Sequence, residues 1–238
     1  MLIEDTRTIR VGLYGCLVGV LLLILAGTGL ADAGEADSGE AASIREGGIH
    51  AAVLAEAYGY EDGGGYVWEN STGSPRELVW ESEVVLRKQP EGTYCSGFTF
   101  AVMFEVAKAR GLFEGKTVRD LRMLQRRWYG AVEDEQTREV QAGIAMEKLG
   151  VGQRIGADEA VAGDFLQFWR TRSGHAVIFL GWVEEDGKRV GIRYRSTQRA
   201  TDGIGDHVER FKAHGGHVDP QRCYFARLDE GVAADEAG

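Results

Sequence analysis

The hydrophobic pattern of the chain changes its period after Gly150. Before this point apolar residues recur at helical spacing, and beyond it they alternate with polar residues as in β-strands. The helical patterns predict helices over 49–58, 95–110, 117–129 and 134–149. The alternating patterns predict strands over 165–169, 175–183, 189–197 and 223–228. Helices followed by antiparallel strands predict an α+β domain in which the helices pack on an antiparallel sheet.

The helix predicted from Cys95 is apolar on most of its faces, so we expect it to be largely buried and to end before Gly111. The next helix begins at Thr117, where Asp120 completes a weak capping box. A helix N-terminus lowers the pKa of a thiol, and a nearby imidazolium lowers it further. Cys95 is therefore a candidate nucleophile, and His175, which opens a predicted strand, is its candidate base.

An apolar run near the N-terminus has the features of an export signal. Two arginines precede the run over 11–30, and the small residues of 31–33 follow it as a signal-peptidase site. We expect residues 1–33 to be a signal peptide that is cleaved on export. A retained N-terminal membrane anchor is the alternative, because a run of this length also spans a bilayer. Both interpretations predict an exported protein, periplasmic or extracellular.

The remaining chain divides into three parts by composition. Residues 34–46 are small and acidic, which is typical of a disordered linker. Residues 47–230 are sufficient for one domain with a sizeable core. Residues 231–238 are typical of a flexible tail.

Charge limits the partners of this protein. The formal net charge of -10 argues against nucleic acid, which requires a basic face, and favours a neutral or zwitterionic substrate. We expect membrane contact only through the N-terminal segment, if that segment is retained, and a monomeric protein.

Two cysteines lie outside the export segment, Cys95 and Cys223. A disulfide is the simplest expectation for an exported protein. However, Cys223 lies in a strand pattern where a free cysteine packs as a small hydrophobic residue, so we favour two free thiols. The spacing of the nearby histidines matches no familiar zinc pattern, and we expect no metal site there. These histidines are His207, His214 and His217.

Asp186 and Gly187 separate two strand patterns and predict a two-residue hairpin turn. If the strands pair through this turn, Gln198 lies opposite His175. Ser196 lies on the same face of the sheet, one pair further along. The hairpin therefore brings a carboxamide beside the imidazole, which is the kind of group that orients a catalytic histidine. A turn shifted by one residue would place Thr197 there instead.

Three segments in this order resemble a known family. They are the Cys-Ser-Gly-Phe of 95–98, the Gly-Asp-Phe-Leu of 163–166 and the Gly-His-Ala-Val-Ile of 174–178. Over about 92–205 the chain resembles the NlpC/P60 cysteine peptidases and the related CHAP amidases. The resemblance implies a papain-like fold, no cofactor, and hydrolysis of amide bonds in cell-wall peptides. It implies Cys95 as nucleophile, His175 as base, and a third polar residue within 196–198, for which we select Gln198 with Ser196 as the alternative.

The chain departs from the family beside this site. Tyr94 stands where the family often has aspartate, and Gln198 where it often has histidine. We expect Tyr94 and Ser96 to contact the substrate. Gln89 precedes Cys95 by the spacing at which papain places its oxyanion-hole glutamine, although an exposed loop glutamine is an equal alternative. The backbone N–H of Cys95 is the other candidate oxyanion donor.

The sequence thus predicts an exported cysteine hydrolase that cleaves an amide or peptide bond, with peptidoglycan stem peptides as the expected substrate. The alternatives are a secreted binding module on the same fold and a thiol acyltransferase. The aromatic residues of 66–68 and 79–80 are consistent with a groove wall or with ordinary core.

Overall fold

The computed structural model describes residues 48–69, 71–131 and 135–231. The described residues all belong to one compact unit. The predicted export segment, the whole predicted linker and most of the predicted tail lie outside the described residues. Among the helices that are described, none is long and apolar enough to cross a membrane.

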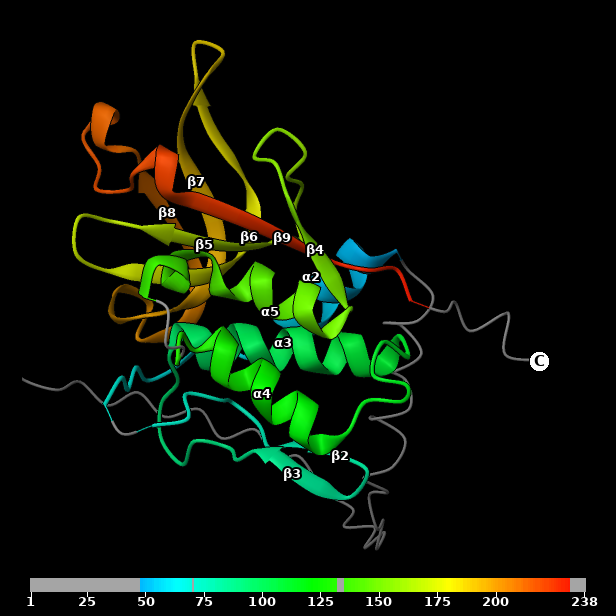
Figure 1. Ribbon diagram of the computed structural model, residues 1–238. Coiled ribbons are helices and arrows are strands. Elements are labelled where there is room, and N and C mark those ends of the chain that lie inside the picture. Colours follow the sequence, from blue (N-terminus) through cyan, green and yellow to red (C-terminus); the bar gives the residue numbers. More distant parts are fainter. Residues whose placement is uncertain (1–47, 70, 132–134, 232–238) are drawn as a thin grey trace, which may run out of the picture. The chain divides into compact units, whose positions relative to one another are not determined.

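A seven-stranded antiparallel sheet forms one layer of the described domain (Figure 1). Its strand order is β1-β8-β7-β6-β5-β9-β4, and every neighbouring pair is antiparallel. The strands are β1 (Gly63–Gly64), β4 (Gly152–Ile155), β5 (Phe165–Trp169), β6 (Gly174–Glu185), β7 (Lys188–Gln198), β8 (Gly203–Arg210) and β9 (Cys223–Leu228). A separate hairpin pairs β2 (Leu78–Trp80) with β3 (Glu83–Leu86).

The helices are α2 (Ile49–Tyr58), α3 (Cys95–Ala109), α4 (Val118–Trp128) and α5 (Gln141–Leu149). The 3₁₀ helices are η1 (Glu135–Val140), η2 (Arg199–Thr201), η3 (Lys212–His214) and η4 (Pro220–Arg222). The predicted α+β class with a large antiparallel sheet is confirmed, and so is the capping box of α4, in which Thr117 and Asp120 bond reciprocally.

The helix predicted over 134–149 is regular only in its second half. The first half is the 3₁₀ helix η1. The Gln141 side chain donates hydrogen bonds to the carbonyl and hydroxyl oxygens of Thr137, at 3.0 and 2.6 Å. In an α-helix the Thr137 carbonyl would accept from the backbone N–H of residue 141, so the side chain competes with that backbone bond.

Both faces of the sheet are covered by apolar side chains. On the helix side, α3 is buried almost all round, and Phe98, Phe104 and Trp128 pack toward Phe165 and Ile178 of the sheet. The opposite face has its own cluster, which the segment after β8 helps to close. This second cluster contains Leu166, Phe168, Val177, Phe179, Ile192, Tyr194, Phe211, Val218 and Phe225.

The β6–β7 hairpin sets the register of the candidate site. The predicted turn is present, with Asp186 and Gly187 both at positive φ (49° and 70°) as a tight hairpin turn requires. The pairing then shifts by one residue between Val183 and Glu184, and shifts back between Phe179 and Gly181. Because the two bulges compensate, the strand ends keep the register that the turn alone predicts.

Candidate active site

Cys95 is the first residue of α3, and its position is fixed by the packing of the first helical turn. Thr99 donates to the Cys95 carbonyl at 2.8 Å, and Trp128 donates to the Thr99 hydroxyl at 3.2 Å. The same turn rests on the backbone of Gly73, because a Cβ on Gly97 would lie 2.2 Å from the Gly73 carbonyl carbon. Cys95 thus stands at a helix N-terminus, where backbone N–H groups lack intrahelical partners.

His175 lies near the start of β6 and is 8 % exposed. Its ring contacts the rings of Phe168 and Tyr194, each with a centroid separation of 5.5 Å and an edge-to-face geometry. The Nε2 atom lies 3.2 Å from Oε1 of Gln198. The structure therefore brings together the imidazole and the carboxamide that the hairpin register predicts.

A hydroxyl fixes which way the Gln198 amide faces. Nε2 of Gln198 donates to Oγ1 of Thr201 at 2.5 Å, and Thr201 donates its own proton to the Gly203 carbonyl at 2.6 Å. Because the Thr201 proton is committed to a carbonyl, its oxygen can only accept from the amide NH₂. Oε1 of Gln198 must then face His175, which places the imidazole proton on Nε2 and leaves Nδ1 as the acceptor for the thiol.

The thiol of Cys95 is activated although it is buried. Burial alone would raise its pKa, but the charge of His175 and a hydrogen bond from that side chain oppose this effect. The backbone N–H of Ala176 and the hydroxyl of Ser96 lower the pKa further, and it falls to about 7. Cys95 is thus ionised to a much greater extent at neutral pH than an ordinary thiol.

The second thiol has the opposite environment. Cys223 is free, like Cys95, and lies in β9 with Sγ 3.5 Å from the Asp219 carbonyl. Burial and the charge of Asp219 raise its pKa to about 12. The favoured expectation of two free thiols is confirmed, and only Cys95 of this pair is poised for nucleophilic chemistry.

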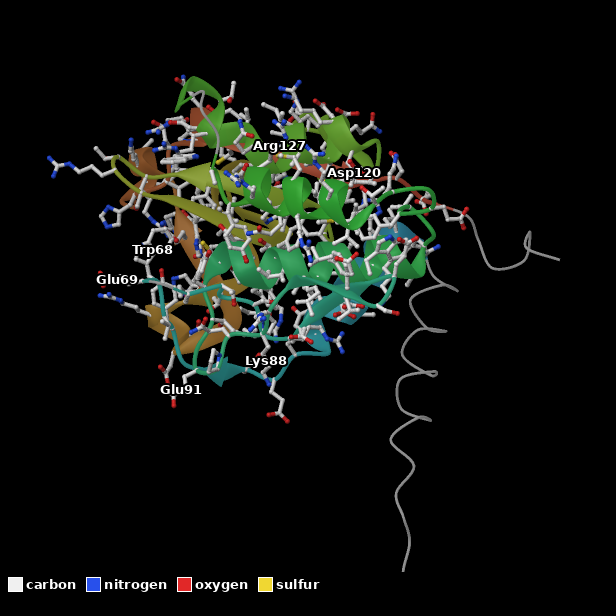
Figure 2. All side chains as sticks on the ribbon, turned by 60° about the horizontal axis from the view of Figure 1, so that its bottom comes forward. Trp68, Glu69, Lys88, Glu91, Asp120 and Arg127 are labelled. Atoms are coloured by element: carbon white, nitrogen blue, oxygen red, sulfur yellow. The ribbon has the colours of Figure 1, made fainter. Side chains whose placement is uncertain are left out.

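A cavity of about 150 Å³ opens beside Cys95, Ser96 and His175. The other lining residues are Trp68, Trp128, Tyr129, Gly130, Arg138, Gln167, Trp169, Gly174 and Ala176. Of these, the sequence indicated only Trp68, as part of a possible groove wall. Trp68 is 62 % exposed and lies at the surface beside Glu69 (Figure 2). Trp80, by contrast, packs on Phe113 in the core.

Two predicted site residues do not line this cavity. Tyr94 is 7 % exposed and lies beneath the site, edge-to-face with Trp68 and Tyr129. Gln89 directs Oε1 to the backbone N–H of Thr72 at 3.0 Å. This bond fixes the amide oxygen of Gln89 and does not place its NH₂ group, so the role of Gln89 as an oxyanion donor stays a prediction.

Ser196 has a separate place. It is fully buried, and its hydroxyl donates to the Ala176 carbonyl at 2.7 Å. The N–H of the same residue, Ala176, faces the Cys95 sulfur. The Ser196 bond therefore stabilises the β6 backbone beside the thiol, and it does not orient the His175 ring. Within the described residues no three His, Cys, Asp or Glu side chains converge as they would at a metal site.

Comparisons of the chain with family models, with curated proteins and with solved structures give no match.

Proposed function

We propose that this protein is a cysteine hydrolase that cleaves an amide bond through an acyl-thioester. The observation that carries the proposal is the Cys95–His175–Gln198 arrangement, in which a depressed thiol pKa coincides with an oriented imidazole. Packing alone needs neither a charged pair at a buried helix start nor a histidine held in one tautomer. A cavity next to the sulfur supplies room for a substrate.

The first half of the reaction forms the acyl-enzyme. The Cys95 thiolate attacks the amide carbonyl and forms an S–C bond, while Nδ1 of His175 holds the thiol proton. The backbone N–H of Cys95, at the positive end of α3, stabilises the tetrahedral oxyanion. His175 then donates the proton to the nitrogen as the C–N bond breaks, and the amine leaves.

The second half returns the enzyme to its starting state. His175 accepts a proton from water as the water oxygen attacks the thioester carbonyl. The S–C bond then breaks and releases the acid. Throughout both halves Gln198 keeps the Nε2 proton in place, so the other nitrogen of the ring remains the one that exchanges protons.

A papain-like fold of the NlpC/P60 type is part of this proposal. It is supported by a nucleophile at the start of a buried helix that packs against an antiparallel sheet, with the base on a neighbouring strand. The ordered motifs around Cys95, Asp164 and His175 support the same family. On this resemblance we propose an exported enzyme that acts on the stem peptides of peptidoglycan.

The test is digestion of purified sacculi, with the released fragments identified by mass spectrometry. We expect peptide release by the wild-type protein and none by Cys95→Ala. No release by the wild type, or equal release by the variant, contradicts the proposal. Fragments joined to an added amine would instead identify an acyltransferase, and stable binding without release would identify a binding module.

A further inference from the structure

Gln167 is a polar side chain that the mechanism above does not use. It lies in the middle of β5, in a strand whose other residues are aromatic or aliphatic. It pairs with Ala176 across the β5–β6 ladder, and the N–H of Ala176 faces the Cys95 sulfur. Gln167 therefore lies one strand away from the thiolate, and it lines the same cavity.

The orientation of the Gln167 amide is fixed by a helix N-terminus. Ala142 lies in the first turn of α5, where the backbone N–H has no intrahelical acceptor. This N–H donates to Oε1 of Gln167 at 2.8 Å. The NH₂ group must then point away from α5, and it has no hydrogen-bond partner among the described residues.

We propose that Gln167 positions the substrate by donating from Nε2 to an oxygen acceptor, carbonyl or carboxylate, on the acyl group that Cys95 attacks. This inference rests on the proposed function. The cavity lining agrees with it, since no carboxylate belongs to the described lining. The site selects acyl groups that carry such an oxygen close to the reacting carbon.

The competing explanation is that Gln167 only caps α5, and two variants separate these roles. Gln167→Glu keeps an oxygen for the Ala142 N–H and loses the NH₂ donor. Gln167→Met has a similar length and loses both. A cap alone predicts that only the methionine variant is altered, through a lower unfolding temperature.

The experiment measures alkylation of Cys95 in the full-length chain in detergent, by peptide mass spectrometry, at a pH where the thiolate is fully formed. The probes are iodoacetamide and iodoacetate, which carry an oxygen acceptor, and iodoethane, which does not. Rates are divided by those of glutathione with the same probe. The two oxygen-bearing probes distinguish a carbonyl from a carboxylate as the preferred acceptor.

We expect wild-type Cys95 to prefer the oxygen-bearing probes over iodoethane by about tenfold relative to glutathione, as one hydrogen bond allows. Gln167→Met and Gln167→Glu should both lose this preference, and Gln167→Glu should disfavour iodoacetate most. Gln153 lies exposed in β4, so Gln153→Met and Gln153→Glu are the matched controls and should keep it.

An unchanged preference in both Gln167 variants would overturn this inference, as would its absence from the wild type. Failure of the proposed function has a different signature, because Cys95 would then react no faster than glutathione near pH 7. The ratio of probes is still measurable in that case at higher pH, where any accessible thiol ionises.

Discussion

The orientation of one carboxamide decides which nitrogen of His175 faces the thiol. Gln198 accepts from Nε2, and the Thr201 hydroxyl prevents the amide from turning over. If the amide turned, its NH₂ would face the ring and favour a proton on Nδ1, the nitrogen that has to accept from Cys95. Thr201 is thus a positioning residue that acts through Gln198.

Substitutions along this chain of hydrogen bonds should therefore lower kcat by graded amounts. We expect Gln198→Ala to lower kcat by about tenfold to hundredfold, part of the 10²–10⁴ that a positioned acid–base group contributes. Thr201→Val should lower kcat less than Gln198→Ala does, and it should shift the pH profile of kcat in the same direction as Gln198→Ala. Thr201→Ser keeps the hydroxyl, so its kcat and pH profile should be those of the wild type. Steady-state kinetics across pH measures these effects.

Ser196 lies on the same face of the sheet as Gln198, so Ser196→Ala is the matched comparison for Gln198→Ala. It removes a hydrogen bond to the Ala176 carbonyl, so we expect a loss of about 1 kcal/mol in the free energy of unfolding and a small effect on kcat. A larger loss of kcat from Ser196→Ala than from Gln198→Ala would reject the assignment of Gln198 as the orienting group.

Among single residues, the roles of Cys95 and His175 could be predicted from local patterns. The position of Gln198 beside His175 could be predicted from one turn. Thr201 and Gln167 were not predicted. Thr201 is close to Gln198 and Gly203 in the sequence, but it meets them only because the chain turns through η2. Gln167 bonds to a helix end whose position was unknown. Gln89 has the spacing of an oxyanion-hole glutamine, but it does not line the cavity, and its oxygen accepts from the Thr72 N–H.

Among the elements, α3 makes a close backbone contact at the turn that presents the nucleophile. Its first turn contacts the Gly73 backbone without any intervening side chain, because position 97 is glycine. We expect Gly97→Ala to destabilise the fold by about 1–3 kcal/mol, the usual cost of overpacking. It should also displace Cys95, because the helix must move away from Gly73.

Urea unfolding and the alkylation rate of Cys95 measure the two effects of Gly97→Ala. Gly48→Ala is the matched control, since a Cβ there meets nothing within 4 Å and its backbone is extended. A Gly97→Ala protein as stable and as reactive as the wild type would show that the contact with Gly73 does not fix the helix start.

Elements with a strong hydrophobic pattern could be predicted, and those with a weak pattern or very few residues could not. The four predicted strands and four predicted helices are present, although the fourth helix begins as η1. The missed strands include β8, where Gly203, Gly205 and Asp206 interrupt the apolar alternation, and β4, which has four residues. Their strand conformation comes from pairing with β7 and β9 rather than from local propensity.

For the described domain as a whole, one buried carboxylate joins elements from opposite ends of the chain. Asp164 has a fully buried side chain and accepts from His50 of α2 at 3.1 Å and from Arg227 of β9 at 2.8 and 2.9 Å. It also accepts from the backbone N–H of Val161 at 2.8 Å. This group therefore ties the first helix and the last strand to the start of β5.

We expect Asp164→Ala to cost about 1–3 kcal/mol, because it removes a buried acceptor that Arg227, His50 and the Val161 N–H share. Asp158→Ala removes an exposed ion pair with Arg189 and should cost less than about 1 kcal/mol. Denaturant unfolding of the two variants measures both values. Equal and small losses would contradict the role of Asp164 as a tie between distant elements.

The α+β architecture of the domain could be predicted from the change of hydrophobic period. The covering of the sheet face opposite the helices could not be predicted. That face is completed by Phe211 and Val218, in a segment with no regular pattern. The lowered pKa of Cys95 was expected from a helix start and a histidine. The contributions of the Ala176 N–H and the Ser96 hydroxyl required the structure.

The most direct test of the central claim, that Cys95 is an activated nucleophile, is its rate of alkylation by iodoacetamide as a function of pH. The thiolate is the reacting form, so a lowered pKa makes the rate rise through a midpoint near pH 7 and remain high above it. Cys223 in the same chain should stay unreactive throughout, because its pKa is raised to about 12. His175→Ala should move the Cys95 midpoint upward. A wild-type midpoint at the ordinary thiol pKa of about 8.5 or higher, or one unchanged by His175→Ala, would contradict the account.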